Sequence, residues 1–446
     1  MPWPMQAPVL SEGSGRLTWP LRLANQLQRA CKAYVNFLLK GLASLISGIA
    51  FTVIVSCAPR IPGSDYAPLA VLLLYYENTF QDLCGPDISD FSIIQPSLAS
   101  RVQAYVQSQV ALGSFGTGTT RLFGPSVNGA GKWEGGAMAP NGKLYGARFG
   151  AIQFVEIDPG SLNVSLVGPT GSTGSGLVLL PTGRLLEIPH SNTAINPVIL
   201  DPNTGTTSTL SGTNSSVMCA GGVLAPNGKV YCTGQASGAS GALEIDPVAG
   251  TATVFGAAQL GTNYGGGAVL AFNGKIYATP FSGGVQMAEI DPETRTITQF
   301  GPTLTANGYF GGVLAPSGKI YVTGFNSTSI LEVDPSTRSV NTYGNTGGGG
   351  NYLSAVLAPN GHVYLMPRNA GSVIDFDPAT RTQTTFGSGW GTGVSAFDGG
   401  VLATNGKIYS FPLVGNGNNQ QPLEIDPRAK GSFCPAVARS AYFNKF

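Results

Sequence analysis

The sequence predicts an all-β protein: a seven-bladed β-propeller closed by an N-terminal strand and preceded by a short, mostly helical extension. A phrase of the form G-G-V-L-A-P-N-G-K-I-Y, followed by a loop, L-E-I-D-P and a Thr-rich tail, occurs seven times. Successive copies start 41 to 46 residues apart, with four short apolar runs each and no helical pattern, which is typical of a propeller blade. The turn glycines that set this period are Gly142, Gly183, Gly228, Gly274, Gly318, Gly361 and Gly406.

Composition agrees with this fold and limits the function. The 63 glycines among 446 residues suit a protein with many tight turns. Charged residues are 11% and the net charge is +1, which excludes the electrostatic footprint of a nucleic-acid-binding protein. The few charges and polar loops favour an extracytoplasmic location.

The N-terminal segment, residues 1–57, is interpreted as a leader with a hydrophobic signal. Its apolar run GLASLISGIAFTVIVSCA follows Lys40 and resembles a lipoprotein signal, which implies lipidation at Cys57. The run begins late for a signal, so we expect translation to start at Val35. The alternative is a single membrane-spanning anchor, since eighteen uncharged residues nearly cross a bilayer.

Residues 58–112 form the expected extension, with short helices at 67–76 and 97–112. The propeller then occupies residues 113–434, and residues 435–446 form a C-terminal tail.

Each copy predicts the same order of elements. A first strand of small residues leads through an Asn-Gly turn of type I′ to a second strand, whose recurrent tyrosine is expected to pack between adjacent blades. The third strand ends at an Asp-Pro turn, where the carboxylate accepts backbone N–H bonds, and an outer strand follows. One carboxylate per turn lacks the ligands that calcium needs, so no metal or cofactor is expected.

The seventh copy lacks its Thr-rich outer strand, and such a strand occurs at residues 118–124, ahead of the first copy. We therefore predict that this segment, which includes Leu122, completes the last blade beside Ile425 and removes an open sheet edge.

Two cysteines outside the repeats, Cys84 and Cys434, are expected to form a disulfide that ties the extension to the ring. Cys219 and Cys232 share a blade. A two-residue turn would place Val223 opposite Cys232 and leave Cys219 out of reach, so this pair is expected to stay unbridged.

The phrase G-G-V-L-A-P-N-G-K-I-Y-V-T-G with I-L-E-V-D-P resembles the blades of NHL, Kelch and regucalcin-like propellers over residues 118–430. The resemblance implies the architecture, because this fold serves many activities. Regucalcin-like lactonases hold a metal by Glu, Asn and Asp, and this chain lacks a matched set. Copper chemistry of the galactose-oxidase kind needs paired histidines, and the chain has only His190 and His362.

The candidate binding surface is the face where the loops differ between copies, opposite the Asn-Gly and Asp-Pro turns. Aromatic residues near the start of each first strand are expected to ring the channel mouth, beside the acidic pair Glu134 and Asp398 of the neighbouring first and seventh blades. The alternative is that these rings only plug the channel. The aromatic residues are Trp133, Tyr264, Tyr309, Tyr352 and Phe397, and the loops add Arg148, His190, Asn192, Gln235, Arg368 and Asn369.

Aromatic rings beside carboxylates and amides suit a sugar or another small polar ligand. The sequence therefore favours an exported, lipid-anchored, non-catalytic binding module whose partner is such a ligand or another protein. One alternative is a lactonase or glycan-cleaving hydrolase that uses Glu134 and Asp398, and another is a surface protein with a purely structural role.

Overall fold

The structure, a computed structural model, describes Cys84 and much of the chain from Pro96 to Phe443, all within the compact unit Asp82–Phe446. The described range omits residues 128–132, 152, 172–173, 191–195, 211–216, 235–240, 262, 282–283, 305–307 and 414–420. Cys57, the hydrophobic segment before it and the helix expected at 67–76 lie outside the described residues. In the described part, no helix has both the length and the apolar character needed to cross a membrane.

Seven antiparallel sheets of four strands each confirm the predicted fold class. Blades 1 to 3 are β2–β5 (Trp133–Met138, Leu144–Arg148, Phe154–Ile157, Val164–Val167), β6–β9 (Gly174–Leu179, Leu185–Pro189, Val198–Leu200, Thr207–Thr209) and β10–β13 (Val223–Leu224, Val230–Thr233, Ala242–Asp246, Thr251–Phe255). Blades 4 to 6 are β14–β17 (Ala268–Leu270, Ile276–Ala278, Val285–Asp291, Thr296–Leu304), β18–β21 (Tyr309–Leu314, Ile320–Gly324, Ile330–Asp334, Ser339–Tyr343) and β22–β25 (Tyr352–Leu357, Val363–Pro367, Val373–Asp377, Thr382–Phe386). Blade 7 is β26–β28 (Phe397–Leu402, Ile408–Pro412, Leu423–Asp426) completed by β1 (Thr119–Leu122).

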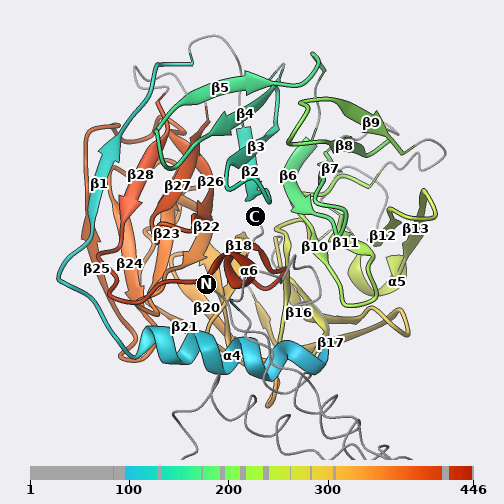
Figure 1. The fold of residues 1–446 in the computed structure, drawn as a ribbon. Helices are drawn as coiled ribbons and strands as arrows, with labels where there is room; N and C mark the ends of the chain where they lie inside the picture. Colours follow the sequence, from blue (N-terminus) through green and yellow to red (C-terminus); the bar gives the residue numbers. More distant parts are fainter. Residues whose placement is uncertain are drawn as a thin grey trace, which may run out of the picture. The chain divides into compact units, whose positions relative to one another are not determined.

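The first strands of the blades surround a common axis. Neighbouring first strands contact each other in the cyclic order β2, β6, β10, β14, β18, β22, β26 and back to β2. Figure 1 shows the blades following one another around the axis in this order, with the first strands innermost. The first strands are buried along their length because they lie between neighbouring blades.

The ring is closed by strands from both ends of the propeller, as predicted. Strand β1 pairs antiparallel with β28, with Thr120 opposite Ile425 and Leu122 opposite Leu423. Arg121 adds two hydrogen bonds to Glu424, at 2.8 and 2.9 Å. The edge of β28 is therefore covered by the segment that precedes the first blade.

The turn between the first and second strands differs from the prediction. In blade 1 the Gly142 amide donates to the Ala139 carbonyl at 3.0 Å, and the Ala139 amide donates to Lys143 at 2.9 Å. Gly142 has a φ of 80°, and Asn141 keeps a negative φ. This is a three-residue loop with glycine in the left-handed position, because a type I′ turn would need positive φ at both residues.

The recurrent tyrosine is buried between blades as expected, and its hydroxyl has a polar role. Tyr145 Oη lies 2.8 Å from Glu156 Oε2, on the strand beside it, and 3.0 Å from the Pro202 carbonyl of blade 2. Lys143 Nζ donates to the same Glu156 at 2.7 Å. Equivalent tyrosine–carboxylate pairs occur at Tyr231, Tyr277, Tyr321, Tyr364 and Tyr409. The sequence phrase is therefore a polar link between neighbouring blades as well as a hydrophobic contact.

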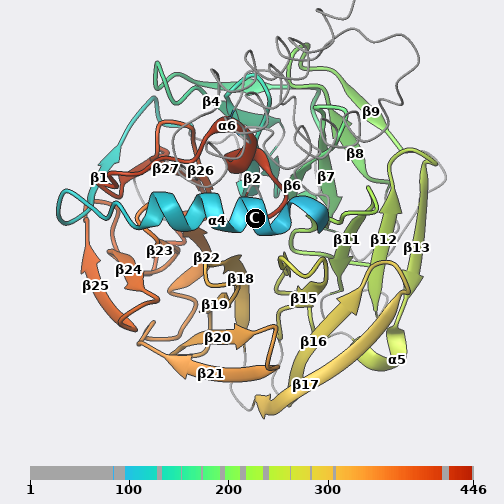
Figure 2. The ribbon, with the colours of Figure 1, turned by 60° about the horizontal axis from the view of Figure 1, so that its bottom comes forward.

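Two helices that flank the propeller in the sequence cover the face that carries the turns between first and second strands, called here the covered face. Helix α4 (Pro96–Val110), which agrees with the predicted helix at 97–112, lies across this face in Figure 2. Its Gln103 donates to the Pro316 carbonyl at 2.9 Å. Helix α6 (Pro435–Arg439) follows blade 7, and Arg439 donates to the Pro140 carbonyl at 3.1 Å. A short helix, α5 (Ala257–Leu260), lies outside the ring after β13.

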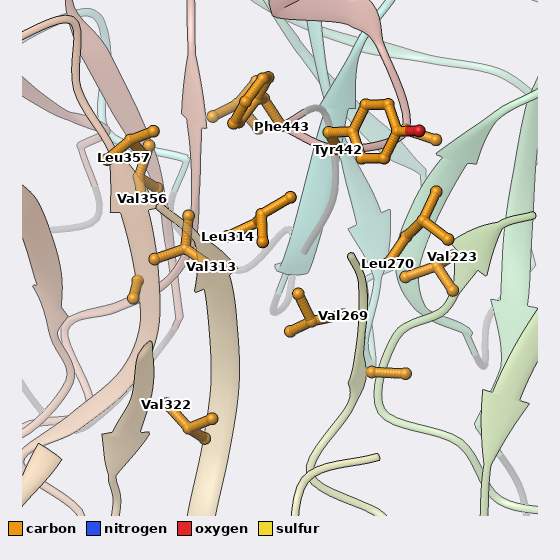
Figure 3. Packing of buried hydrophobic residues seen from close by; sticks show 14 of the residues in the cluster. Val223, Val269, Leu270, Val313, Leu314, Val322, Val356, Leu357, Tyr442 and Phe443 are labelled. Carbon is orange, nitrogen blue, oxygen red and sulfur yellow. The ribbon is translucent and has the colours of Figure 1, made fainter. Parts of the chain in front are cut away.

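After α6, two aromatic side chains close the axis from the covered face. Tyr442 and Phe443 lie beside the apolar ends of first strands, near Leu270, Leu314 and Leu357 (Figure 3). Tyr442 is fully buried, and its ring lies 5.0 Å from that of Phe272. The covered end of the axis is thus filled by the C-terminal segment.

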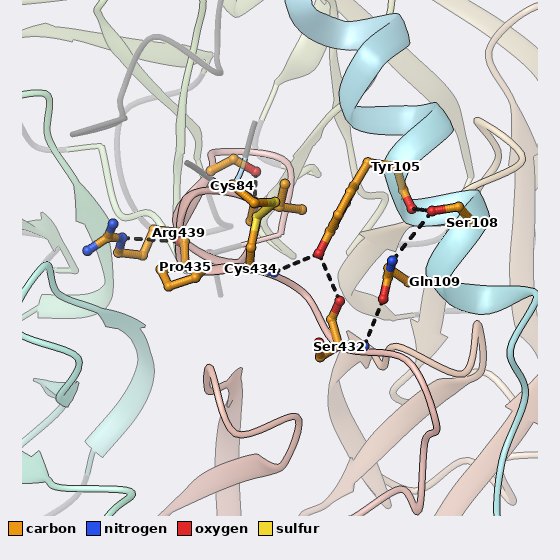
Figure 4. Close-up of a disulfide and its surroundings, with 10 residues drawn as sticks. Cys84, Tyr105, Ser108, Gln109, Ser432, Cys434, Pro435 and Arg439 are labelled. Carbon is orange, nitrogen blue, oxygen red and sulfur yellow. Dashed lines mark hydrogen bonds between the residues drawn. A yellow bond between two sulfur atoms is a disulfide. The ribbon is translucent and has the colours of Figure 1, made fainter. Parts of the chain in front are cut away.

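A disulfide between Cys84 and Cys434, the pair expected from the sequence, fastens this cover (Figure 4). The Cys434 amide donates to the Tyr105 hydroxyl of α4 at 3.1 Å, and that hydroxyl donates to the Ser432 carbonyl at 3.0 Å. The extension and the C-terminal segment therefore form one connected layer.

The prediction for the other two cysteines is wrong, because Cys219 and Cys232 form a disulfide with a Cα–Cα distance of 5.9 Å. Val223 pairs with Tyr231, and Cys219 pairs with Gly234, so between these pairs three residues on one strand face two on the other. The extra residue is a β-bulge, which draws Cys219 toward Cys232.

Candidate functional site at the open end of the axis

The five aromatic residues expected around the mouth are buried inside their blades. The indole N–H of Trp133 donates to the Gln153 carbonyl at 2.9 Å, and Tyr352 Oη donates to the Ser372 carbonyl at 3.0 Å. Tyr264, Tyr309 and Phe397 are likewise no more than 2% exposed. The polar atoms of the first four point to residues at or just before the third strand of the same blade, so the expected aromatic ring around the mouth is not formed.

The residue that follows Trp133, Tyr309, Tyr352 and Phe397 lies at the axis instead, at the end opposite α4 and α6, which is called here the open end. This position, eight residues before the turn glycine, holds what is called here the axial ring: Glu134, Ser175, Ala220, Gly266, Phe310, Leu353 and Asp398. Side chains of blades that are not neighbours interact here: Ala220 of blade 3 shares an apolar cluster with Phe310 and Leu353 of blades 5 and 6. Such contacts between non-neighbouring blades occur only where the blades converge.

A β-bulge explains why the aromatic side chain points into its blade while the side chain after it points to the axis. The strand register shifts between Trp133 and Gly136, and between Phe310 and Gly312, at the start of the first strand. Gly135 and Gly311 take positive φ values of 67° and 55° within these shifts. Because a bulge interrupts the strict alternation of side chains, the aromatic residue turns into the blade and its successor turns to the axis.

Glu134 and Asp398 form a buried acidic pair, 5% and 1% exposed. Burial raises the pKa of Glu134 to about 7, while Ser175 and the Arg368 guanidinium oppose this shift. Burial, and then the charge of Glu134, raise the pKa of Asp398 well above its usual value. Two carboxyl groups that disfavour each other's ionisation hold at least one proton near neutral pH.

Arg368 lies close enough to affect both carboxyl groups, although it belongs to blade 6 and Glu134 to blade 1. Its guanidinium stands over the Phe325 ring, 5.1 Å from the centroid. Arg368 Nε and Asp398 Oδ1 are both buried, and neither has a hydrogen-bond partner among the described residues. One guanidinium N–H and one carboxyl oxygen, both buried, are thus left without hydrogen bonds at the same end of the axis, which is costly without a ligand or water.

Opposite the acidic pair, the axis is apolar. Phe281 and Phe325, both half-buried, pack on the cluster of Ala220, Phe310 and Leu353. The ring centroids of Phe281 and Phe325 lie 5.7 and 6.0 Å from that of Phe310. The open end of the axis therefore has a polar half at blades 7, 1 and 6 and an aromatic half at blades 4 and 5.

Phe281, Phe325 and Arg368 occupy one repeat position, seven residues after the turn glycine. The same position holds Phe149 and His190, whose rings lie 5.0 Å apart. His190 Nδ1 lies 2.6 Å from the Cys219 carbonyl, and burial lowers the pKa of this imidazole. His190 therefore lies in the loops of the open face as a neutral group bonded to the next blade.

Arg148 is not available to a ligand. Its guanidinium donates to both carboxylate oxygens of Glu187, at 2.6 and 3.1 Å, and stacks on the Phe154 ring at 4.2 Å. Both partners of this ion pair are buried, so it joins blades 1 and 2. Asn369 is likewise engaged, because its Oδ1 accepts a hydrogen bond from the Ser395 amide, in the loop before β26, at 3.0 Å. Asn192 and Gln235 lie outside the described residues.

The structure thus keeps Glu134, Asp398 and Arg368 together and separates them from the predicted aromatic residues. The sequence reasoning missed Ser175, Phe281 and Phe325. A signal existed for the two phenylalanines, because they share a repeat position with His190 and Arg368. Among the residues that the structure describes, no group of three or more His, Cys, Asp or Glu side chains is placed to hold a metal ion.

Solved structures with the same fold include two lyases and an extracellular domain. A streptogramin B lyase superposes with a TM-score of 0.57 at 12% identity, over 69% of this chain and 97% of that one. Virginiamycin B lyase from Staphylococcus aureus gives 0.55 at 12% identity, over 69% and 99%. The extracellular domain of the putative hybrid two-component system BT4673 from B. thetaiotaomicron gives 0.51 at 10%, over 68% and 42%.

At these identities the likeness establishes the seven-bladed β-propeller fold and nothing finer. No protein-family model and no curated protein sequence matches the chain. The resemblance to NHL, Kelch and regucalcin-like repeats stays a prediction.

Proposed function

We propose that this chain is an extracytoplasmic binding module that takes up a small ligand at the open end of its axis. The observation that carries the proposal is the pair of unpartnered buried atoms, Asp398 Oδ1 and Arg368 Nε, beside a half-buried aromatic cluster. Protein sites for small molecules combine an apolar lining with a few polar groups that lack internal partners. The layer of α4 and α6 occupies the other face, which favours the end of the axis with Glu134 and Asp398 for this role.

A thermal-shift screen of the full chain against amino acids, sugars, amines and carboxylic acids tests this proposal. We expect at least one class to raise the melting temperature in a saturable way. Phe325→Ala, at the open end, is expected to abolish the shift. Val248→Ala, in the turn after β12 and 93% exposed, is expected to leave the shift unchanged. A screen without a saturable shift, or a shift insensitive to Phe325→Ala, would contradict it.

We further propose export and anchoring by a lipid on Cys57. Two disulfides support an oxidising compartment, because such bonds are rare in the cytosol. Among the proteins of the same fold, BT4673 contributes an extracellular domain, which fits this location. Cys57→Ala is expected to release the protein from the membrane fraction in the native host, and a variant that stays membrane-bound would contradict lipid anchoring.

An enzyme is the second candidate, because the pKa of Glu134 at about 7 suits a general acid or base. The hydrolase anticipated from the sequence would use this group with Asp398, and two proteins of the same fold are described as lyases. Turnover of a lactone or glycan substrate that is lost in Glu134→Gln, while the melting temperature is not lowered, would establish catalysis over simple binding.

A further inference from the structure

We propose that the ligand is a small zwitterion with an apolar side chain, of the α-amino acid class. Its ammonium group would bind the pair Glu134 and Asp398, its carboxylate would bind Arg368, and its side chain would lie against the phenylalanine cluster. This inference rests on the proposed binding function and specifies the chemistry of its ligand.

The charges of the site select against a ligand with one charge. Asp398 Oδ1 can only be satisfied by a donor when the group is ionised, and Arg368 Nε can only be satisfied by an acceptor. A simple amine would leave the Arg368 Nε donor without an acceptor. A simple carboxylate would leave the negative charge of the acidic pair, once one carboxyl group ionises, without a donor. Because a buried polar atom without a partner is costly, a ligand that carries both groups has the advantage.

The position of Arg368 couples the polar half to the apolar half. Its guanidinium lies over the Phe325 ring, and Phe325 is part of the cluster that includes Phe281 and Phe310. A carboxylate held by Arg368 therefore lies beside aromatic surface. An α-amino acid places its carboxylate, its ammonium and its side chain on one carbon, which matches three kinds of surface that meet around one axis.

Aromatic rings also favour an apolar or aromatic side chain over a polar one. Phe281 and Phe325 keep part of their surface exposed within the cluster, and burying that surface under a ligand is favourable. The Phe281 ring lies 5.7 Å from that of Phe310 and 6.4 Å from that of Phe325, separations at which aromatic rings pack favourably. Phenylalanine is therefore the first probe, and serine the matched polar one.

Calorimetric titration of the full chain at pH 7 tests this with three probes of one shape: L-phenylalanine, phenethylamine and 3-phenylpropionate. Phenethylamine lacks the carboxylate, and 3-phenylpropionate lacks the amine. We expect L-phenylalanine to bind about tenfold or more tightly than either analogue, since each lost charge-assisted hydrogen bond costs about 1.5–3 kcal/mol. Equal affinity within about threefold for all three probes would overturn the zwitterion assignment.

Two variants assign the charged groups. The double variant Glu134→Gln with Asp398→Asn, which removes the charge of the acidic pair, is expected to weaken L-phenylalanine about tenfold or more and not to weaken 3-phenylpropionate. Arg368→Gln is expected to weaken L-phenylalanine similarly and to leave phenethylamine unchanged. Glu293→Gln, an exposed carboxylate of blade 4, is the matched control and should bind like the unmodified protein. Losses that do not follow the charge removed would contradict the assignment, and the comparison on unmodified protein stands even if a variant fails to fold.

The experiments distinguish a wrong zwitterion assignment from a wrong binding function. If no amino acid binds but another class gives a saturable shift lost in Phe325→Ala, the zwitterion assignment is wrong and the binding function stands. If no class binds, both are wrong.

Discussion

At the scale of single residues, two buried tyrosines, Tyr321 and Tyr442, allow a comparison of a bonded and an unbonded hydroxyl group. Tyr321 Oη donates to Glu332 Oε2 at 2.8 Å, in the link between blades 5 and 6. Tyr442 Oη is buried and has no hydrogen-bond partner among the described residues. Leu186 shows what the link requires, because blade 2 replaces the tyrosine and its partner carboxylate together, by Leu186 opposite Ile199.

Removal of each hydroxyl should therefore have a different effect. Tyr321→Phe is expected to lower the free energy of unfolding by about 1–2 kcal/mol, because it leaves Glu332 with an unpaired oxygen. Tyr442→Phe should be neutral or stabilising, because it removes an unsatisfied polar atom. Denaturant unfolding of both variants measures this, and equal losses would show that the hydroxyl of Tyr321 contributes nothing specific.

At the scale of elements, the strand that closes the ring makes a testable contribution. The Phe123 amide donates to the Pro422 carbonyl at 3.2 Å, and the antiparallel alternation then points the Thr119 amide, paired with Asp426, toward β28. Thr119→Pro removes this donor, so we expect about 1–3 kcal/mol of destabilisation and association through the uncovered edge of β28. Thr117→Pro, in the exposed bend just before the strand, is the control. Thermal melting with light scattering reports both effects, and identical behaviour of the two variants would mean that β1 does not hold the ring closed.

The sequence allowed the blades and their closure to be predicted, because both depend on local signals. Turn residues recur at each Asn-Gly and Asp-Pro, and the outer strand missing after Asp426 is present before Phe123. The directions of Trp133, Phe397 and Cys219 were not predictable in the same way. They depend on a bulge in each first strand, and paired glycines such as Gly135 and Gly136 conceal the break in alternation.

At the scale of the whole molecule, two buried carboxyl groups make the free energy of unfolding depend on pH in opposite directions. Burial would raise the pKa of Glu244, but hydrogen bonds from Arg295, Lys229 and Tyr231 outweigh it and hold the pKa at about 2. The stability that this group contributes is present above its unfolded pKa of 4.5 and is lost as pH falls toward 2. Glu134 acts in the reverse sense. Its pKa is raised from 4.5 to about 7, so its contribution is present below 4.5 and is lost as pH rises through 7.

We therefore expect maximal stability near pH 5, with a decline on the order of 3 kcal/mol between about pH 4.5 and 7 from the shift at Glu134. Glu134→Gln should lessen that decline, the rest of which comes from Asp398 with its likewise raised pKa, and should leave the acid limb unchanged. Urea unfolding across pH 3–8 tests this, with Glu293→Gln as the control. Parallel curves for the unmodified protein and Glu134→Gln would show that Glu134 holds no additional proton in the folded state.

The central claim is that ligand binds at the open end of the axis and not on the face covered by α4 and α6. Hydrogen–deuterium exchange of the full chain, with and without the strongest ligand from the screen, tests it most directly. We predict slower exchange at residues 133–138, 323–326, 366–369 and 397–402, with no change in 96–110 or 435–443. Protection confined to α4 and α6, with none around Glu134 and Asp398, would contradict the account.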